Sequence, residues 1–494
     1  MSGFAMPRRN FVATASIAAA AAAATGVASV AQADEAQAPS VGLNGLPNKY
    51  ETDILIIGGG QSGFSAGLRA LELGAEKVML IDKVSGEGDD FAGSSYRCGG
   101  TFLIPTANTD EAKEAYIETL WNYGEKKTDR DLIAIMADRA IDTAEWMMDQ
   151  GVEYTDPVVN FADYPDILQR TTIPHVSLPL LRDNFIDEGG QLVFNTKALH
   201  FNIDANGVCG VMAQDPDGFF NIVAKKTILC SGGYASGKQF LEDHIDEGDE
   251  IISSCPEGIT GDGIYMAQEI GGWTVQAGGI KSVYLIPMSP DDLENGRGGF
   301  TYDYIVVNEN GERYFDEALA HWQHGQVLLQ QPNATCAYIA DSKVWDSIKS
   351  NFDTFASLGI TTWQADTIEE LAEMINMPVD TLVNTIDEYN SHMVDDHTEG
   401  LAINKSGYAK TIDTPPYYSL YPLKPGCPLV YGGLKINTNA QVLQCDGNVI
   451  PNLFAAGEVA GGFFYNGYFG GSQMAKAAIF GHVAAENAVA EINA

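Results

Sequence analysis

Residues 52–82 read TDILIIGGGQSGFSAGLRALELGAEKVMLID, and this stretch decides the fold class. Residues 54–57 form a continuous apolar run, which predicts a strand buried on both faces. Residues 64–73 predict a helix, and residues 78–81 predict a second short strand that ends at Asp82. The stretch therefore predicts a β-α-β unit, which builds a parallel sheet.

The glycines between the first strand and the helix have the spacing of a dinucleotide-binding turn. Gly58 would make the tight turn, Gly60 would let the backbone approach a pyrophosphate, and Gly63 would let the helix pack closely on the strand. The helix N-terminus would offer N–H groups to the phosphates, and Asp82 would accept hydrogen bonds from a ribose. A glycine-rich turn alone can be structural, but both strands, the helix and the acid together favour nucleotide binding.

Length and charge limit the classes of function. The chain has 494 residues, of which 45% are apolar, so it can form two or three globular domains. Its formal net charge of -38 argues against a nucleic-acid partner, because no basic surface could offset that field. The simplest interpretation of the acidity is solubility outside the cytoplasm. An anionic substrate would require local positive charge.

Residues 1–33 have the pattern of a twin-arginine signal peptide. Arg8 and Arg9 precede an alanine-rich apolar stretch, and Ala31-Gln32-Ala33 forms a cleavage site. We expect export to the periplasm or the cell-surface side of the cytoplasmic membrane, with a membrane anchor as the lesser alternative. Residues 34–49 resemble a linker, and no later segment is long and apolar enough to span a bilayer.

The cysteines predict neither a disulfide framework nor a metal centre. There are seven, scattered along the chain, and none forms a CxxC or CxxCH motif. This pattern argues against an iron–sulfur cluster and against haem attachment. We expect most of them to be core residues and expect no metal site.

The remaining chain suggests a discontinuous domain. Residues 85–100, SGEGDDFAGSSYRCGG, form a loop of small residues that could crowd against a flat ring, although an ordinary flexible loop is the simpler interpretation of this stretch alone. Alternation over residues 192–230 predicts an antiparallel β-meander that returns to the parallel sheet. Residues 275–413 are rich in proline and aromatic residues and contain helical stretches, whereas residues 414–494 return to glycine-rich strands and a final helix.

With these motifs in place, residues 50–494 resemble the flavoprotein subunit of the fumarate reductase and succinate dehydrogenase superfamily, which includes the 3-ketosteroid dehydrogenases. The resemblance rests on the motifs GGGQSG, AKKTILCSGGY, TGDG, VVNENGERYFDE, YGGLKINTNAQVL, NLFAAGEVAGG and YFGGSQMAKAAIFG. It implies an α/β fold in which a Rossmann-like FAD-binding domain, residues 50–274 and 414–494, holds an inserted α+β capping domain, residues 275–413.

The resemblance also implies which residues hold FAD. They are Gly58, Gly60, Gly63 and Asp82 at the ADP half, Ala198 near the adenine, Gly93, Ser94, Ser95, Gly99 and Gly100 along the flavin, and Asp262, Glu458 and Ser472. The helix that starts near Ser472 would point its positive end at the flavin. We expect no counterpart of the superfamily's extra haem or FMN domains. Electrons would therefore come from a separate partner, such as a cytochrome or a quinol-linked membrane protein.

The chain departs from the fumarate reductases at the positions that clamp a dicarboxylate. Where those enzymes carry catalytic or binding Arg and His residues, this chain has His321, Tyr468 and Leu429. Without paired guanidinium groups, fumarate is a poor substrate. The 3-ketosteroid dehydrogenases place tyrosines at the positions of Tyr468 and His321. A phenol can donate a hydrogen bond or a proton to a neutral carbonyl compound.

Four residues are candidates for catalysis. Tyr468 lies in a glycine-flanked turn, although a core tyrosine is the alternative. His321 fits the motif spacing but would serve equally as a solvent-facing histidine. Arg297 matches the proton-relay arginine or an ordinary loop arginine. Tyr116 would correspond to a third ketosteroid-dehydrogenase tyrosine.

Together these features predict an exported FAD-dependent ene-reductase. It would transfer hydride from flavin to an activated C=C bond of a flat, largely neutral substrate such as a steroid or polyphenol enone. The alternatives are a 3-ketosteroid-type dehydrogenase that runs in the oxidative direction, and a fumarate or other carboxylate reductase. A non-enzymatic alternative is a flavin electron carrier, which a lid of over a hundred residues argues against.

Overall fold

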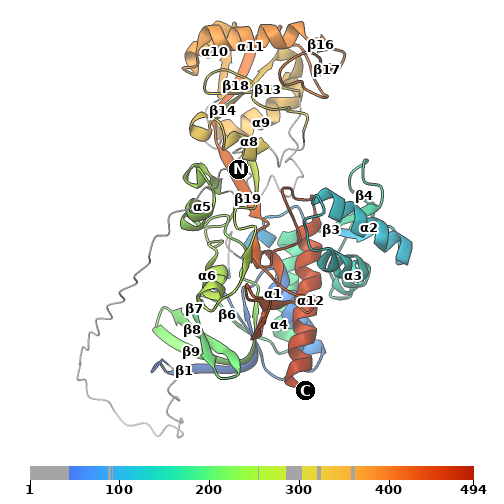
Figure 1. Cartoon of the computed structure of the whole chain (residues 1–494), viewed down its shortest axis with the longest axis vertical. Coiled ribbons are helices and arrows are strands. Elements are labelled where there is room, and N and C mark those ends of the chain that lie inside the picture. The colour runs from blue at the N-terminus through green and yellow to red at the C-terminus, as the bar shows by residue number, and fades with distance from the viewer. Residues whose placement is uncertain are drawn as a thin grey trace, which may run out of the picture. The chain divides into compact units, whose positions relative to one another are not determined.

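The computed structural model describes residues 44–86, 91, 93–253, 255–284, 303–319, 324–357 and 362–494. Its central element is an eight-stranded sheet (Figure 1). The parallel part follows the order β6-β2-β1-β9-β22, and β21 adds an antiparallel edge. These strands are β1 (Asn48–Ile57), β2 (Val78–Ile81), β6 (Gln191–Val193), β9 (Gly218–Leu229), β21 (Gln441–Leu443) and β22 (Val449–Ala455).

The β-α-β unit is confirmed, with a helix that begins earlier than predicted. Helix α1 (Gln61–Glu72) starts directly after Gly60, whose extended backbone caps it, so the turn is shorter than the pattern suggested. Residues 54–57 and all of β2 are buried, as a strand covered on both faces should be. Helix α1 packs against α12 (Ser472–Ile492) and α4 (Pro174–Asp187).

The predicted meander is confirmed in part. Strands β7 (Lys197–Asp204), β8 (Gly207–Asp215) and β9 form an antiparallel run that ends in the parallel sheet. The segment around residues 192–194 was predicted to belong to it but is instead the parallel strand β6 beside β2. The physical reason is that α4 precedes β6, and a helical crossover returns the chain parallel to its neighbour.

A second sheet follows the order β13-β14-β18-β15. Its strands are β13 (Ile305–Asn308), β14 (Cys336–Asp341), β15 (Thr362–Ala365) and β18 (Tyr417–Leu423). Strand β18 lies beyond residue 413, so the sheet extends past the predicted end of the inserted segment. Alternate residues of β13 and β14 enter two separate clusters, one with α9 (Trp345–Ser357) and the other with α10 (Ile368–Met374) and α11 (Val379–Ser391). Helices therefore cover both faces.

Smaller elements frame the site. Strand β12 (Ile280–Tyr284) pairs with β19 (Pro425–Val430), which also pairs with β10 (Ile252–Ser253). A three-stranded sheet runs β3-β5-β4, with β3 (Thr101–Pro105) packed against α2 (Asp110–Tyr123), α3 (Arg130–Asp149) and α12. Strands β4 (Val158–Val159) and β5 (Ile167–Thr171) form its hairpin. Other elements include α5 (Lys238–His244), α6 (Asp262–Glu269), α8 (His324–Leu328), β11 (Thr274–Val275) and β20 (Gly433–Leu434).

Within the ranges given above, no helix combines enough length with enough apolar character to cross a membrane.

Candidate functional site

A cavity of about 350 Å³ opens where the parallel strands end. Its lining includes Ile57 at the end of β1, Ile81 at the end of β2, Cys230 just after β9 and Gly457 just after β22. The carboxyl ends of parallel strands are the usual ligand site of an open α/β sheet. The sheet topology therefore places this cavity where a nucleotide is expected.

Close backbone contacts explain why two of the predicted positions are occupied by glycine. Gly58 has a φ of +111°, and a Cβ there would lie 2.3 Å from the carbonyl oxygen of Cys230. A Cβ on Gly63 would lie 2.0 Å from the carbonyl oxygen of Gly58, so Gly63 allows packing and does not line the cavity. Gly60 does line it and, as the N-cap of α1, brings no side chain of its own to the helix N-terminus, where Gln61 N–H donates to Ser95 Oγ over 3.2 Å. The first N–H groups of α1 are thus suited to a phosphate.

One end of the cavity carries Asp82 and a cluster of charges around Asp262. The Gly59 N–H donates to Asp82 Oδ2 over 2.7 Å, and burial raises the pKa of this carboxyl. Lys83 Nζ donates to Asp262 Oδ2 (2.7 Å), and Lys197 Nζ lies 3.2 Å from the same oxygen. Burial opposes ionisation of Asp262, but the hydrogen bond and charge of Lys83 outweigh it and lower its pKa. Ala198, which was predicted to lie near the adenine, lines the wall beside Lys197.

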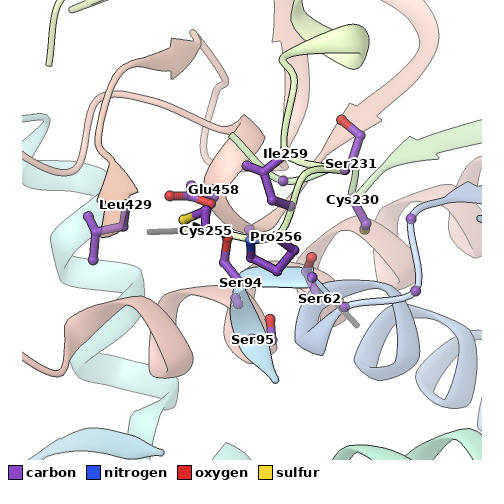
Figure 2. A pocket seen from close by; sticks show the side chains of 18 of the residues that line it. Ser62, Ser94, Ser95, Cys230, Ser231, Cys255, Pro256, Ile259, Leu429 and Glu458 are labelled. Atoms are coloured by element: carbon purple, nitrogen blue, oxygen red, sulfur yellow. Dashed lines mark hydrogen bonds between the residues drawn. The ribbon is translucent and has the colours of Figure 1, made fainter. Parts of the chain in front are cut away.

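The opposite end brings together the predicted loop and Glu458. Figure 2 shows Ser94, Cys255 and Glu458 close together, although they come from three separate segments. Ser94 Oγ lies 3.7 Å from Cys255 Sγ, and Cys255 Sγ donates to the carbonyl of Pro428 (2.7 Å). Gly93, Ser95, Gly99 and Gly100 line the same end. The small-residue loop therefore forms a wall of this cavity.

Glu458 lines the cavity and braces this part of its wall. Its carboxylate accepts hydrogen bonds from Val430 N–H (2.8 Å) and Gly233 N–H (3.2 Å), which ties β19 to the loop after β9. Burial raises the pKa of Glu458, and the nearby charge of Lys476 opposes that rise. Lys476 is itself fully buried on α12, where its Nζ donates to the carbonyl of Ala460 (2.9 Å). Burial lowers the pKa of Lys476, and the charge of Glu458 opposes that fall.

Tyr468 lies in the cavity wall beside the start of α12. The Gly471 N–H donates to Tyr468 Oη over 3.2 Å, and burial raises the pKa of the phenol to about 12. Gly471, with a φ of +91°, is the N-cap of α12 and has no side chain with which to cap the helix. Gly471 and Gln473 both line the cavity. The positive end of the α12 dipole therefore faces the cavity next to a protonated phenol.

Ser472 was predicted to contact the cofactor, but its side chain does not reach the cavity. Ser472 does not line the cavity, because its hydroxyl is fully buried and donates to the carbonyl of Phe469 over 2.6 Å. Successive residues of a helix point about 100° apart, so the neighbours Gly471 and Gln473 face the cavity while Ser472 faces the core.

Of the other predicted catalytic residues, Tyr116 lies in the described part of the chain and is not brought to the site. Tyr116 lies on α2 with no exposed surface, outside the cavity lining, so it does not reach a substrate in this arrangement. His321 and Arg297 lie outside the described residues. The motif before His321 is ordered by a buried ion pair, in which Arg313 Nη2 donates to Glu317 Oε2 (2.6 Å).

Several wall residues were missed from the sequence. Arg97 is the one arginine among the described lining residues, and three thiols, those of Cys98, Cys230 and Cys255, also line the cavity. Burial raises the pKa of Cys98 to about 11 and that of Cys230 to about 12, so these thiols stay protonated and unreactive. The sequence could have singled out Arg97 as a site residue, because it is the only Lys or Arg within residues 84–112. The thiols carry no spacing signal.

The lining as a whole fits FAD. At one end of the lining stands Asp82, which follows the second strand. The glycines at the start of α1 come next and leave room for a pyrophosphate. At the other end, a wall of small residues accompanies Tyr468 and the N-terminus of α12. Added Cβ atoms on Gly58 and Gly457 would meet neighbouring atoms at 2.3 Å and 2.4 Å, so side chains are excluded from this cradle. Asp82, Gly60 and Ala198 would hold the ADP half, and the loop at residues 93–100 would face the flavin ring.

Comparison with known proteins gives the same cofactor. The model of the family described as FAD binding domain matches residues 53–473. The chain is 27% identical over 452 residues to a probable fumarate reductase from Shewanella frigidimarina, covering 88% of this chain and 74% of that protein. It is 26% identical over 526 residues to a digoxin reductase from Eggerthella lenta, covering 94% and 91%. It is also 26% identical over 457 residues to a vinyl phenol reductase from Lactiplantibacillus plantarum, covering 83% and 90%.

Solved structures show the same fold. An open flavocytochrome c3 fumarate reductase matches with a TM-score of 0.72 and 26% identity, covering 90% of this chain and 79% of that one. A 3-ketosteroid Δ1-dehydrogenase from Sterolibacterium denitrificans shares the fold with a TM-score of 0.73 at 18% identity, covering 90% and 100%. The chain therefore belongs to the FAD binding domain family, within the fumarate reductase and succinate dehydrogenase flavoprotein superfamily, and is an FAD-dependent oxidoreductase acting on CH–CH groups.

Proposed function

We propose that the chain is an ene-reductase that adds hydrogen across a C=C bond conjugated to a carbonyl, in a flat and largely neutral substrate. The observation that carries this proposal is the position of Tyr468. Its phenol lies in the cavity wall at the N-terminus of α12 and receives a hydrogen bond from Gly471 N–H. The resemblance of the last block to the dicarboxylate enzymes implies that this neutral hydrogen-bond donor replaces a cation of those enzymes.

The charges of the wall support a neutral substrate. Among the described lining residues, the acids are Asp82, Asp262 and Glu458, and the bases are Lys83, Arg97 and Lys197, so the formal charges sum to zero. Lys83 and Lys197 are engaged by Asp262 at the adenosine end. This leaves Arg97 as the guanidinium at the other end, and one guanidinium does not clamp two carboxylates.

Bound FAD in its reduced form supplies a hydride equivalent for one carbon of the double bond. Tyr468 has a pKa raised to about 12 by burial, so it keeps its proton near neutral pH. Its O–H can donate to the substrate carbonyl or give a proton to the second carbon, a role that His321 would share. The positive end of α12 stabilises negative charge that develops nearby. The same groups would serve the reverse reaction of a ketosteroid-type dehydrogenase.

The names of two relatives favour this substrate class. The digoxin reductase and the vinyl phenol reductase carry the names of molecules without a dicarboxylate. We infer that a neutral enone or a vinyl compound conjugated to an aromatic ring suits this cavity as well.

Arg97 favours a second candidate, a reductase of an α,β-unsaturated monocarboxylate. Its side chain lines the same end of the cavity as Tyr468 and Cys98. A single guanidinium can hold one carboxylate through two parallel hydrogen bonds. The name of the probable fumarate reductase is consistent with a carboxylate substrate in the superfamily.

The test is an anaerobic reoxidation assay. The FAD-loaded protein is reduced with dithionite, and flavin absorbance is followed after addition of an enone steroid, an isoflavonoid, a cinnamate, urocanate or fumarate. Rapid reoxidation by a neutral enone, with fumarate inert, is the expected result. Reoxidation by cinnamate or urocanate alone would select the monocarboxylate candidate, and reoxidation by fumarate would contradict the argument from the missing cations.

We also propose that the enzyme works outside the cytoplasm after twin-arginine export. This proposal rests on Arg8, Arg9 and the cleavage pattern at residues 31–33, which lie outside the described residues, and on the acidic composition.

A further inference from the structure

The hairpin of β4 and β5 exposes apolar side chains on an edge strand. Val158 is 52% exposed, Val159 is 45% exposed and Phe161 is 37% exposed. Strand β4 ends the order β3-β5-β4, so among the described strands it pairs with β5 alone. Exposed apolar residues on an unprotected edge indicate a contact surface for another protein. We call residues 153–166 the hairpin surface.

Carboxylates surround these apolar residues. Glu153, Asp156, Asp163 and Asp166 are all exposed on the hairpin surface. No lysine, arginine or histidine occurs within residues 140–169. An apolar centre with an acidic rim is complementary to a protein with an apolar patch ringed by lysines.

The hairpin surface is directly connected to the flavin cavity. Asn160 Nδ2 donates to the carbonyl of Gly470 over 2.9 Å, and Gly470 lines the cavity next to the start of α12. The Phe161 ring lies within 3.2 Å of the place where a Cβ on Gly470 would stand, and its centroid is 5.6 Å from that of Phe469. A protein docked on this surface would touch Asn160 and Phe161, which themselves contact Gly470 of the cavity wall. Electron tunnelling weakens steeply with distance, so this is a favourable place for a redox partner.

We propose that residues 153–166 dock a small basic electron-transfer protein with an exposed haem edge, which delivers electrons to the flavin. The inference rests on the proposed function, because each C=C bond reduced takes up two electrons and two protons. Two one-electron donors are therefore oxidised for each turnover, and the protons come from the site and solvent. A second copy of this chain is a poor occupant, since two acidic rims would repel each other.

The test measures electron transfer between the holoenzyme and a basic cytochrome c. Dithionite-reduced enzyme is mixed anaerobically with ferric cytochrome c, and the haem absorbance gives the second-order rate at several salt concentrations. For the double variant Asp156→Lys/Asp163→Lys we expect a rate at least about tenfold lower at low salt. The rates should converge near 0.5 M salt, where the Debye length falls to roughly 4 Å.

A matched control variant also reverses two carboxylate charges, but on α10 and outside the hairpin surface. Glu369 and Glu373 are exposed on α10, and Glu369→Lys/Glu373→Lys should keep at least half of the wild-type rate. Reoxidation by a small neutral quinone should be equal in all three proteins, which shows that the flavin itself is unchanged. Equal cytochrome rates in the hairpin variant and wild type, or equal losses in both variants, would overturn the inference.

Two further outcomes separate this inference from its premise. If no enone reoxidises the wild-type flavin while the cytochrome rate still depends on Asp156 and Asp163, the proposed function fails and the docking surface stands. If sedimentation shows a dimer of the wild type that the hairpin variant disrupts, the surface is a self-association site and the inference is wrong.

Discussion

The amide of Gly471 donates a hydrogen bond to the phenol oxygen of Tyr468 over 3.2 Å at the first turn of α12. This contact fixes the phenol in the wall of the cavity while the phenol keeps its proton, because burial raises its pKa to about 12. The helix N-terminus and the proton donor are thus aimed at the same space. The proposed proton transfer depends on this placement of Tyr468 beside the N-terminus of α12.

Gly63→Val should abolish FAD binding and lower stability. A Cβ at residue 63 would lie 2.0 Å from the carbonyl oxygen of Gly58, so the turn that admits the pyrophosphate must open. The flavin content of the purified protein is the measurement. Gly407→Ala is the control, because nothing lies within 4 Å of a Cβ there. Full flavin content in Gly63→Val would show that close helix–strand packing is not required.

The burial of His482 predicts that the folded protein loses stability in acid. Burial lowers the pKa of His482 to about 3, whereas an unfolded histidine titrates near 6.5. Between these values the unfolded chain binds the extra proton, so the free energy of unfolding falls as the pH decreases from about 6.5 towards 3. Each unit of pKa difference is worth about 1.4 kcal/mol, so the loss should reach several kcal/mol.

The matched variant is His482→Phe, whose ring can keep the edge-on contact with Trp146 at a centroid distance of 4.2 Å. We expect its unfolding free energy, measured in urea, to depend less on pH in this range than that of the wild type. His200→Gln is the control, since this side chain is 53% exposed. An unchanged pH slope in His482→Phe would refute the assignment.

Arg97→Gln separates the two substrate classes. If the substrate is neutral, the variant should change the rate of flavin reoxidation by an enone less than about threefold. If the substrate is a monocarboxylate, loss of the bidentate guanidinium should cost about 2 kcal/mol or more of binding, which appears as a raised KM. The measurement is steady-state kinetics with cinnamate and with an enone steroid. Equal losses with both substrates would mean that Arg97 supports the cavity wall instead.

Arg8→Lys/Arg9→Lys should retain the precursor in the cytoplasm of a bacterial host that has the twin-arginine pathway. Cell fractionation and the size of the retained protein are the measurements. Arg182→Lys changes an arginine in the folded part of the chain and should leave export unaffected. Normal processing of the doubly substituted precursor would mean that another route exports the protein.

Local patterns predicted the nucleotide site well. The run at residues 54–57, the glycines and Asp82 are neighbours in sequence and in space, so their spacing alone defines the turn. Glu458 was found through its motif, and the structure supplies the reason for its burial, which is a carboxylate bridging Val430 and Gly233.

Long-range contacts could not be predicted in this way. The pairing of β18 with β14 and β15 depends on strands that are far apart in the chain. Lys476 looks like a surface residue of a helix until the structure places it in the core beside Glu458. Ser472 was misplaced because one step along a helix turns a side chain from the cavity into the core.

The measurement that tests the central claim most directly is a single-turnover experiment with Tyr468→Phe. Reduced enzyme is mixed with the enone that reoxidises the wild type fastest, and the flavin absorbance is followed. Loss of the proton donor should slow this step about 100-fold, while flavin content and reoxidation by a neutral quinone stay unchanged. Tyr116→Phe, a buried tyrosine outside the cavity, should react at the wild-type rate. Wild-type speed in Tyr468→Phe would contradict the account.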